Sequence, residues 1–154
     1  MAKPYPYFVS LDDAISLCQE SQVNLNSEII PISESINRII STEIQSMVND
    51  PGFDNSAMDG FAVIYSDTIS PPSKLSIIGS LMAGSAENHK LSSGQAIRIM
   101  TGAPVPQGAD SIIPIEACTV NGDEVILNQP SKPHFIRKLG ENFAKGQVIF
   151  SSGE

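Results

Sequence analysis

The sequence contains no tryptophan, and aromatic residues make up only 6% of its 154 positions. Proteins that bind single-stranded nucleic acid stack bases on aromatic side chains, so that activity is not expected here. Basic residues are also scarce, since nine Lys and Arg stand against 17 Asp and Glu, for a net charge of −8. This charge argues against nucleic-acid and anionic-membrane partners, and any anion site must depend on local donors.

Long apolar runs are absent as well. No window approaches the roughly 18 uninterrupted apolar residues of a membrane-spanning helix, and the N-terminus lacks the apolar stretch of a signal peptide. We therefore expect a soluble, cytoplasmic protein. The two cysteines have no zinc-site spacing, and we expect both Cys18, on the apolar stripe of a helix, and Cys118, in a strand, to be buried and inert.

Several catalytic motifs are missing from the sequence. It has no phosphate-binding G-x-x-x-x-G-K-[ST] loop, no G-x-G-x-x-G, no H-E-x-x-H and no G-x-S-x-G. His89 and His134 stand alone in the sequence, and we expect both to be surface residues without a partner. Arg137 and Lys138 are the one pair of adjacent basic residues in the sequence, and they are either a solvated pair or a phosphate-binding site.

One helix is predicted near the N-terminus, over 11–21. Leu11, Ala14, Ile15 and Cys18 recur at helical spacing, and Ser10 with Asp13 forms a capping box with Asp in place of Glu. A second, shorter apolar face follows Ser33, formed by the isoleucines at 36, 39 and 40. An extended piece over 42–48 then ends at Pro51-Gly52, where a type II turn would give Gly52 a positive φ.

From residue 60 the apolar period shifts toward two, which is typical of strands. The expected strands are 61–65, 75–78, 96–100, 111–115, 117–120, 124–128 and 147–150. Asn121-Gly122 predicts a hairpin, and Pro114 inside a strand predicts an edge or a bulge.

The pattern predicts a mixed α+β fold in two lobes. A small helical or extended N-terminal lobe, formed by 1–46 and 139–154, would serve as an outer linker or dimerisation lobe. Residues 47–138 would form a β-rich, barrel-like second lobe. Because the last stretch ends without a capping element, we expect the chain to be the first portion of a longer protein.

The stretch "DPGFDNSAMDGFAV" has two possible functions. Asp54, Asn55 and Ser56 could bond the amides of their own turn, and Asp59-Gly60 could form a tight turn into a strand. Alternatively, Asp50, Asp54 or Asp59 could be an oxygen ligand for Mg²⁺ or a base. The calcium-loop pattern is absent, so a carboxylate that shares a cation with a phosphorylated ligand is the more plausible metal site.

The stretch "IRIMTGAPVPQGAD" also leaves two readings open. Arg98 and Met100 point away from Ile97 and Ile99, and the strand ends at Thr101-Gly102. Gly102 would let backbone amides approach a ligand, and the Thr101 hydroxyl can donate or accept. A proline-stiffened loop of this kind could hold a small oxyanion, or it could be only a strand connection.

Together with "GENFAKGQVIFSSGE", these stretches resemble the MoeA-type molybdopterin molybdenumtransferases, a family related to the gephyrin E domain. The resemblance implies an enzyme that inserts molybdenum from molybdate into adenylylated molybdopterin and releases AMP, assisted by Mg²⁺ or a similar cation. It also implies a later α/β domain that binds molybdopterin and is absent from this chain. The chain alone would then be inactive. The active cleft would be shared between the subunits of a homodimer.

The resemblance also implies roles for individual residues. Asp59 and Thr101 match the family's catalytic positions, with Asp59 as the Mg²⁺ ligand and Thr101 bonded to a phosphate or molybdate oxygen. Further candidates for substrate binding lie within or beside the motifs: Ser56, Arg98, Gly102 and Arg137. The expected upstream partner is a molybdopterin adenylyltransferase.

The sequence departs from the family pattern at one place. "IRKLGEN" replaces a richer basic cluster that ends in Gly-Glu-Asp, so Leu139 and Asn142 reduce the charge of this corner. The alternative function is a non-catalytic dimerisation or scaffold module of a multidomain protein.

Overall fold

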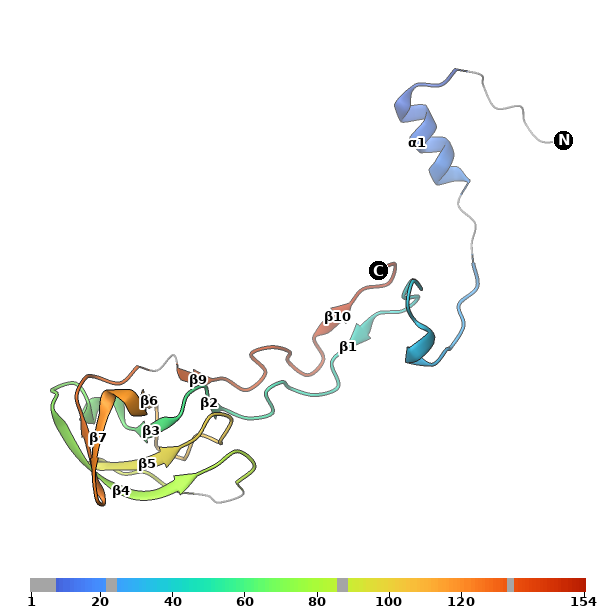
Figure 1. Cartoon of the computed structure of the whole chain (residues 1–154). Helices are drawn as coiled ribbons and strands as arrows, with labels where there is room; N and C mark the ends of the chain where they lie inside the picture. Colours follow the sequence, from blue (N-terminus) through green and yellow to red (C-terminus); the bar gives the residue numbers. More distant parts are fainter. Residues whose placement is uncertain (1–7, 22–24, 86–88, 133–134) are drawn as a thin grey trace.

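The computed structural model describes residues 8–21, 25–85, 89–132 and 135–154. In chain order these form a helix, a two-stranded ribbon and a curled β lobe, and the chain returns along the ribbon to its C-terminus (Figure 1). Within these ranges no helix has both the length and the apolar character to cross a membrane.

Helix α1 spans Leu11–Glu20, which confirms the predicted helix to within one residue. The Ser10 hydroxyl oxygen accepts a hydrogen bond from the Asp13 amide at 3.1 Å, and the hydroxyl donates to the Asp13 carboxylate at 2.7 Å. The predicted cap by Ser10 is therefore present, but the Asp13 carboxylate accepts from the Ser10 hydroxyl, whereas a capping box uses the Ser10 amide. The prediction that Cys18 is buried is wrong, because no side chain of α1 is buried against another described residue and Cys18 is exposed.

The predicted second apolar face does not form a regular helix. One short 3₁₀ turn, η1 (Ile32–Glu34), lies in this segment. The side chains of Ile36 and Ile39 are 78% and 75% exposed. Their helical spacing therefore does not correspond to a buried face.

Residues 40–56 and 136–154 run antiparallel to each other and connect the β lobe to the rest of the chain (Figure 1). Strand β1 (Ile44–Gln45) pairs with β10 (Val148–Phe150), and β2 (Asn55–Ser56) pairs with β9 (Ile136–Arg137). Between these pairs, the Asp50 amide donates to the Phe143 carbonyl at 2.8 Å. This ribbon confirms the predicted extended piece and the predicted last strand.

The predicted type II turn at Pro51-Gly52 is wrong. The Asp50–Pro51 peptide bond is cis, and Gly52 is not among the glycines with a positive φ. The bend is instead fixed from outside, because the Gly140 amide donates to the Pro51 carbonyl at 2.9 Å. Gly140 lies 89 positions further along the chain, so the residues around Pro51 could not indicate this contact.

The β lobe is one six-stranded sheet in the order β6-β3-β5-β4-β8-β7. Its strands are β3 (Gly60–Val63), β4 (Ser73–Leu81), β5 (Gln95–Ile99), β6 (Ser111–Pro114), β7 (Cys118–Asn121) and β8 (Glu124–Leu127). Of these six strands, β4 and β5 pair in parallel and the other neighbours pair antiparallel. Short 3₁₀ turns, η2 (Tyr65–Asp67) and η3 (Ile115–Ala117), follow β3 and β6, where the predicted strands continue one or more residues too far.

Two local predictions for this sheet are confirmed. The hairpin at Asn121-Gly122 joins β7 and β8: Asn121 ends β7 and pairs with Glu124, and Gly122 and Asp123 form the turn. Pro114 ends β6, which is an edge strand. A proline has no amide to donate, and at the end of an edge strand this breaks no hydrogen bond in the centre of the sheet.

Apolar side chains form two buried clusters, to which successive residues of β3 and β5 contribute in alternation. On β3, Phe61 and Val63 belong to one buried cluster and Ala62 to the other. The same alternation on β5 places Ala96 with Phe61 and places Ile97 and Ile99 with Ala62. Strands β3 and β5 are thus fixed from both sides, and the site described below lies at their ends.

The described chain is mostly β, with one helix and a curled, half-barrel sheet. This confirms the β-rich second lobe. The mixed α+β class holds only in part, because the expected helical lobe consists of α1 and extended segments with few buried side chains. The division into lobes at 46/47 and 138/139 stays a prediction.

Candidate functional site

Asp59 and Thr101, the two predicted catalytic residues, are in direct contact although 42 positions separate them. Asp59 precedes β3, and Thr101 lies two residues beyond the end of β5. These strands are antiparallel, with Gly60 opposite Ile99, so the two residues meet at one end of the sheet. The Thr101 amide donates to Asp59 Oδ1 at 2.8 Å, and the Thr101 hydroxyl donates to the same oxygen at 2.7 Å.

The backbone on the Asp59 side is held rigidly. The Ile115 amide donates to the Asp59 carbonyl at 3.0 Å. Next to it, Gly60 leaves no space for a side chain, because a Cβ there would lie 2.0 Å from the Ile113 carbonyl oxygen. Strand β6 therefore approaches β3 closely because residue 60 is glycine.

The backbone on the Thr101 side is held by Ser56. The Gly102 amide donates to the Ser56 carbonyl at 2.8 Å, and the Ser56 amide donates to the Ala103 carbonyl at 3.0 Å. Gly102 has a φ of +81°, a conformation that favours glycine. The Ser56 side chain is fully buried and its hydroxyl donates to the Met58 carbonyl at 2.5 Å. These contacts place Ser56 and Gly102 as supports of the pair, and their predicted roles in substrate binding stay predictions.

The paired carboxylate is ionised at neutral pH. The pKa of Asp59 is lowered by the hydrogen bond from the Thr101 amide, then by that from the Thr101 hydroxyl, and to a smaller extent by the charge of Arg98. Both side chains of the pair are exposed, as is Arg98 on β5. The hydrogen bonds that the described residues make to the Asp59 carboxylate both reach Oδ1, which leaves Oδ2 for a ligand.

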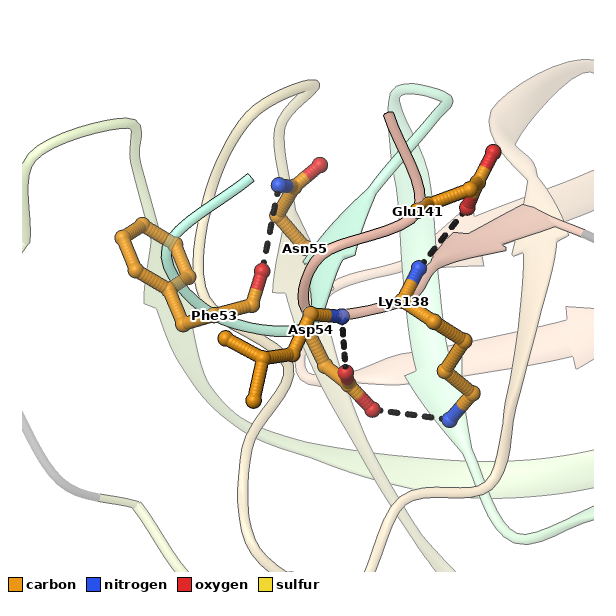
Figure 2. A network of polar contacts seen from close by, with 6 residues as sticks. Phe53, Asp54, Asn55, Lys138 and Glu141 are labelled. Carbon is orange, nitrogen blue, oxygen red and sulfur yellow. Dashed lines mark hydrogen bonds and ion pairs between the residues drawn. The ribbon is translucent and has the colours of Figure 1, made fainter. Parts of the chain in front are cut away.

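Asp54 has a different environment, shown in Figure 2. Lys138 Nζ donates to Asp54 Oδ2 at 2.7 Å, and the Leu139 amide donates to Oδ1 at 2.8 Å. The Lys138 amide in turn donates to Glu141 at 2.9 Å. These bonds, from Lys138 first and Leu139 second, lower the pKa of Asp54. Asp54 therefore joins the two chain segments where they enter the β lobe, rather than bonding the amides of its own turn, which was one of the two roles that the sequence left open.

Arg137 also has a partner within the chain. Its guanidinium donates to Asn142 Oδ1 at 3.2 Å, and Asn142 Nδ2 donates to the Asp50 carboxylate at 2.8 Å. An amide can bridge a cation and an anion in this way, whereas an aspartate at position 142 could not donate to Asp50. Sequence reasoning missed this bridge and the Asp54–Lys138 pair, because neither contact leaves a local pattern.

The donor set at Asp59 fits a shared cation and not a dedicated cage. No group of three or more His, Cys, Asp or Glu side chains in the described ranges could hold a metal ion. Mg²⁺ is commonly bound by one or two carboxylates together with substrate phosphates, so a single available carboxylate oxygen suits that arrangement.

The remaining candidate side chains have structural roles. Cys118 is half-buried, its thiol donates to the Pro114 carbonyl at 3.4 Å, and burial, with the charge of Glu116, raises its pKa to about 11. Its predicted inertness follows. The prediction that His89 is isolated is wrong, because its half-buried ring lies 3.2 Å from the position of a Cβ on Gly79 and it has interaction partners. The prediction for His134 lies outside the described residues.

Comparison with known proteins shows which family this chain resembles. Residues 9–154 match the family model described as the MoeA N-terminal region (domain I and II). A molybdopterin molybdenumtransferase from Haemophilus influenzae is 38% identical over 148 residues, covering 94% of this chain and 36% of the relative. One from Bacillus subtilis is 30% identical over 154 residues, with 94% and 36% covered.

A solved structure is also similar. The crystal structure of the molybdopterin biosynthesis MoeA protein from Pyrococcus horikoshii OT3 has 30% sequence identity and a TM-score of 0.75, over 81% of this chain and 34% of that chain. The chain thus spans about a third of the length of the relatives that it matches.

Proposed function

The chain belongs to the MoeA family, matching its N-terminal region, and from this we propose that it forms part of an enzyme that inserts molybdenum into adenylylated molybdopterin. Molybdate supplies the metal and AMP leaves. The observation that carries the proposal is the Asp59–Thr101 pair, an exposed, ionised carboxylate held through Oδ1 at the end of the sheet, with Oδ2 left for a ligand.

The pair acts by positioning charge. Molybdate is a dianion and the adenylylated ligand carries phosphate, so bare carboxylates alone would repel both. Asp59 would hold Mg²⁺ or a similar cation through Oδ2, directly or through a water. Such a cation, when bound, neutralises phosphate charge and polarises the phosphoryl group. Gly60, Ser56 and Gly102 keep the carboxylate in place, so that it need not reorganise when substrate binds.

The wider assembly is part of the same proposal. Asp59 and Thr101 are exposed, which suits residues that complete a cleft whose other wall belongs to another domain or subunit. We propose a homodimer with the active site shared between subunits, working in the cytoplasm. A molybdopterin adenylyltransferase would act upstream, because the substrate must first receive AMP. Arg98 and Arg137 would then add positive charge near the bound ligand.

A dimerisation or scaffold module is the second candidate function. It is favoured by the apolar surface of residues 25–39, where Leu25, Ile29 and Ile32 are 85%, 103% and 90% exposed. Apolar side chains exposed to this extent in one segment are typical of an interaction surface. This role and the catalytic one are compatible in one protein.

The test is molybdenum insertion by the complete protein that carries this chain, measured as AMP release and as molybdenum in the product. Asp59→Asn keeps the size of the side chain and removes its charge, and is expected to lower the rate about 10- to 100-fold. The matched control is Asp123→Asn, an exposed carboxylate in the turn between β7 and β8. Equal rates in the two variants would remove Asp59 from the chemistry and leave the scaffold role.

A further inference from the structure

Thr101 uses all of its hydrogen-bond donors on one oxygen of Asp59. A threonine has one amide and one hydroxyl to donate, and both reach Asp59 Oδ1, at 2.8 and 2.7 Å. Hydrogen bonds to an ionised carboxylate are roughly twice as strong as neutral ones. A ligand oxyanion that competed for either donor would have to displace the carboxylate.

We propose, on the basis of the function proposed above, that Thr101 is a positioning residue that acts through Asp59, and that it donates no hydrogen bond to molybdate or phosphate. By holding Oδ1 from two sides it fixes the plane of the carboxylate and directs Oδ2 outward. This replaces the expectation that the Thr101 hydroxyl binds a substrate oxygen directly.

The local chemistry agrees with this assignment. An oxyanion next to Thr101 would lie against the negative charge of Asp59, and the two would repel each other. The Thr101 hydroxyl oxygen keeps only lone pairs, and Asp59 Oδ2 is a charged acceptor. The pair thus presents acceptors alone to the solvent, and it takes a hydrated divalent cation or a hydrogen-bond donor.

The backbone explains why the arrangement is rigid. The Met100 amide donates to the Leu81 carbonyl at 3.0 Å, and the Ala103 amide donates to the Met100 carbonyl at 3.0 Å, so the residues on both sides of Thr101 are fixed. Asp59 is fixed through its own carbonyl by Ile115. Neither main chain has to move for the two bonds to form. The hydrogen bond from the Thr101 amide to Asp59 is therefore retained when the Thr101 side chain is changed, and the hydrogen bond from the hydroxyl can be removed by itself.

The test is a double-mutant cycle in the complete enzyme, with AMP release as the rate. Thr101→Val removes the hydroxyl and keeps the shape and the amide, and Asp59→Ala removes the carboxylate that Thr101 holds. We expect Thr101→Val to lower kcat by about tenfold in the Asp59 enzyme, with the KM for molybdate and the melting temperature unchanged. In the Asp59→Ala background the same change should have an effect below about twofold.

Two further variants sharpen the result. Thr101→Ser restores the hydroxyl and should recover most of the rate that Thr101→Val loses. Thr119→Val is the control, because Thr119 is an exposed threonine of β7 on the same sheet, far along the strand order from β3. A tenfold loss from Thr101→Val in both Asp59 backgrounds, or a raised KM for molybdate, would show an independent contact with substrate and overturn the proposal.

A measurement without catalysis separates this proposal from the function on which it rests. In ¹H–¹⁵N spectra of the 154-residue chain, the Thr101 amide proton should shift upfield in Asp59→Ala, and added molybdate alone should leave it in place in the unchanged chain. A shift with molybdate would overturn the positioning role. If the complete protein released no AMP at all, the function would fail, and the amide shifts would still decide whether Thr101 is committed to Asp59.

Discussion

Replacing Gly60 by alanine tests whether the structure of the site depends on the close approach of β3 and β6. The Cβ of an alanine at this position would lie 2.0 Å from the Ile113 carbonyl oxygen, 2.9 Å from the Ile113 carbonyl carbon and 3.0 Å from Pro114 Cα. Contacts under 3.0 Å are essentially never made by real Cβ atoms, and all three atoms belong to backbone. Strand β6 would therefore have to move outward by about 1 Å or more.

The size of the effect follows from what that movement disrupts. Strand β6 pairs with β3 through Gly60, Phe61, Ala62 and Val63, and buried residues lie on both sides of this ladder. Overpacking a core costs typically 1–3 kcal/mol and more when backbone must move, so we expect a loss of about 3 kcal/mol. For a chain of this length that corresponds to a fall in melting temperature of roughly 6–12 °C.

The assay is thermal unfolding followed by circular dichroism, with Gly52→Ala as the matched control. Gly52 lies in the same motif, and a Cβ there would meet only the Asn49 carbonyl oxygen, at 4.0 Å. We expect Gly52→Ala to change stability by less than about 0.5 kcal/mol. If Gly60→Ala melted together with Gly52→Ala, the packing argument for the motif glycine would be refuted.

Two further predictions concern titratable groups. Asp54→Asn should lower the free energy of unfolding by about 1 kcal/mol at pH 7, a value discounted because the pair with Lys138 is partly exposed. Because the pKa of Asp54 is lowered in the folded chain, the stabilisation is present above its usual value near 3.8 and is lost as pH falls through the folded value. Urea unfolding should therefore show the difference at pH 7 and lose it toward pH 2, and a difference independent of pH would contradict the ion-pair account. Cys118, with a pKa of about 11, carries about one thiolate per thousand at pH 8, against roughly a quarter for an ordinary thiol. Iodoacetamide should accordingly modify the exposed Cys18 roughly 100-fold faster or more, as read by peptide mass, and equal rates would contradict the burial of Cys118.

Local signals predicted the local structure. The helix cap at Ser10, the period of two on β3 and β5, and the hairpin at Asn121-Gly122 each depend on residues within a few positions of one another. The structure confirms all of them. Burial depends on distant partners, which explains why the exposure of Cys18 could not be predicted from a correct helix.

The site was predicted in part. The family motifs identified Asp59 and Thr101, but nothing in either motif indicates that the second residue donates twice to the first. The Asp54–Lys138 pair joins residues 84 positions apart, and the bend at Pro51-Gly52 is held by the similarly distant Gly140. Such contacts arise when the outgoing and returning chains lie side by side in the ribbon, and a single sequence does not encode that pairing in any short pattern.

The most direct test of the catalytic account is a crystal structure of the complete protein with adenylylated molybdopterin and a divalent cation bound. We expect Asp59 Oδ2 to lie within direct or single-water reach of the cation or the ligand, with Thr101 still bonded to Oδ1. A structure in which Asp59 and Thr101 face bulk solvent, away from the nucleotide and the dithiolene, would contradict the account.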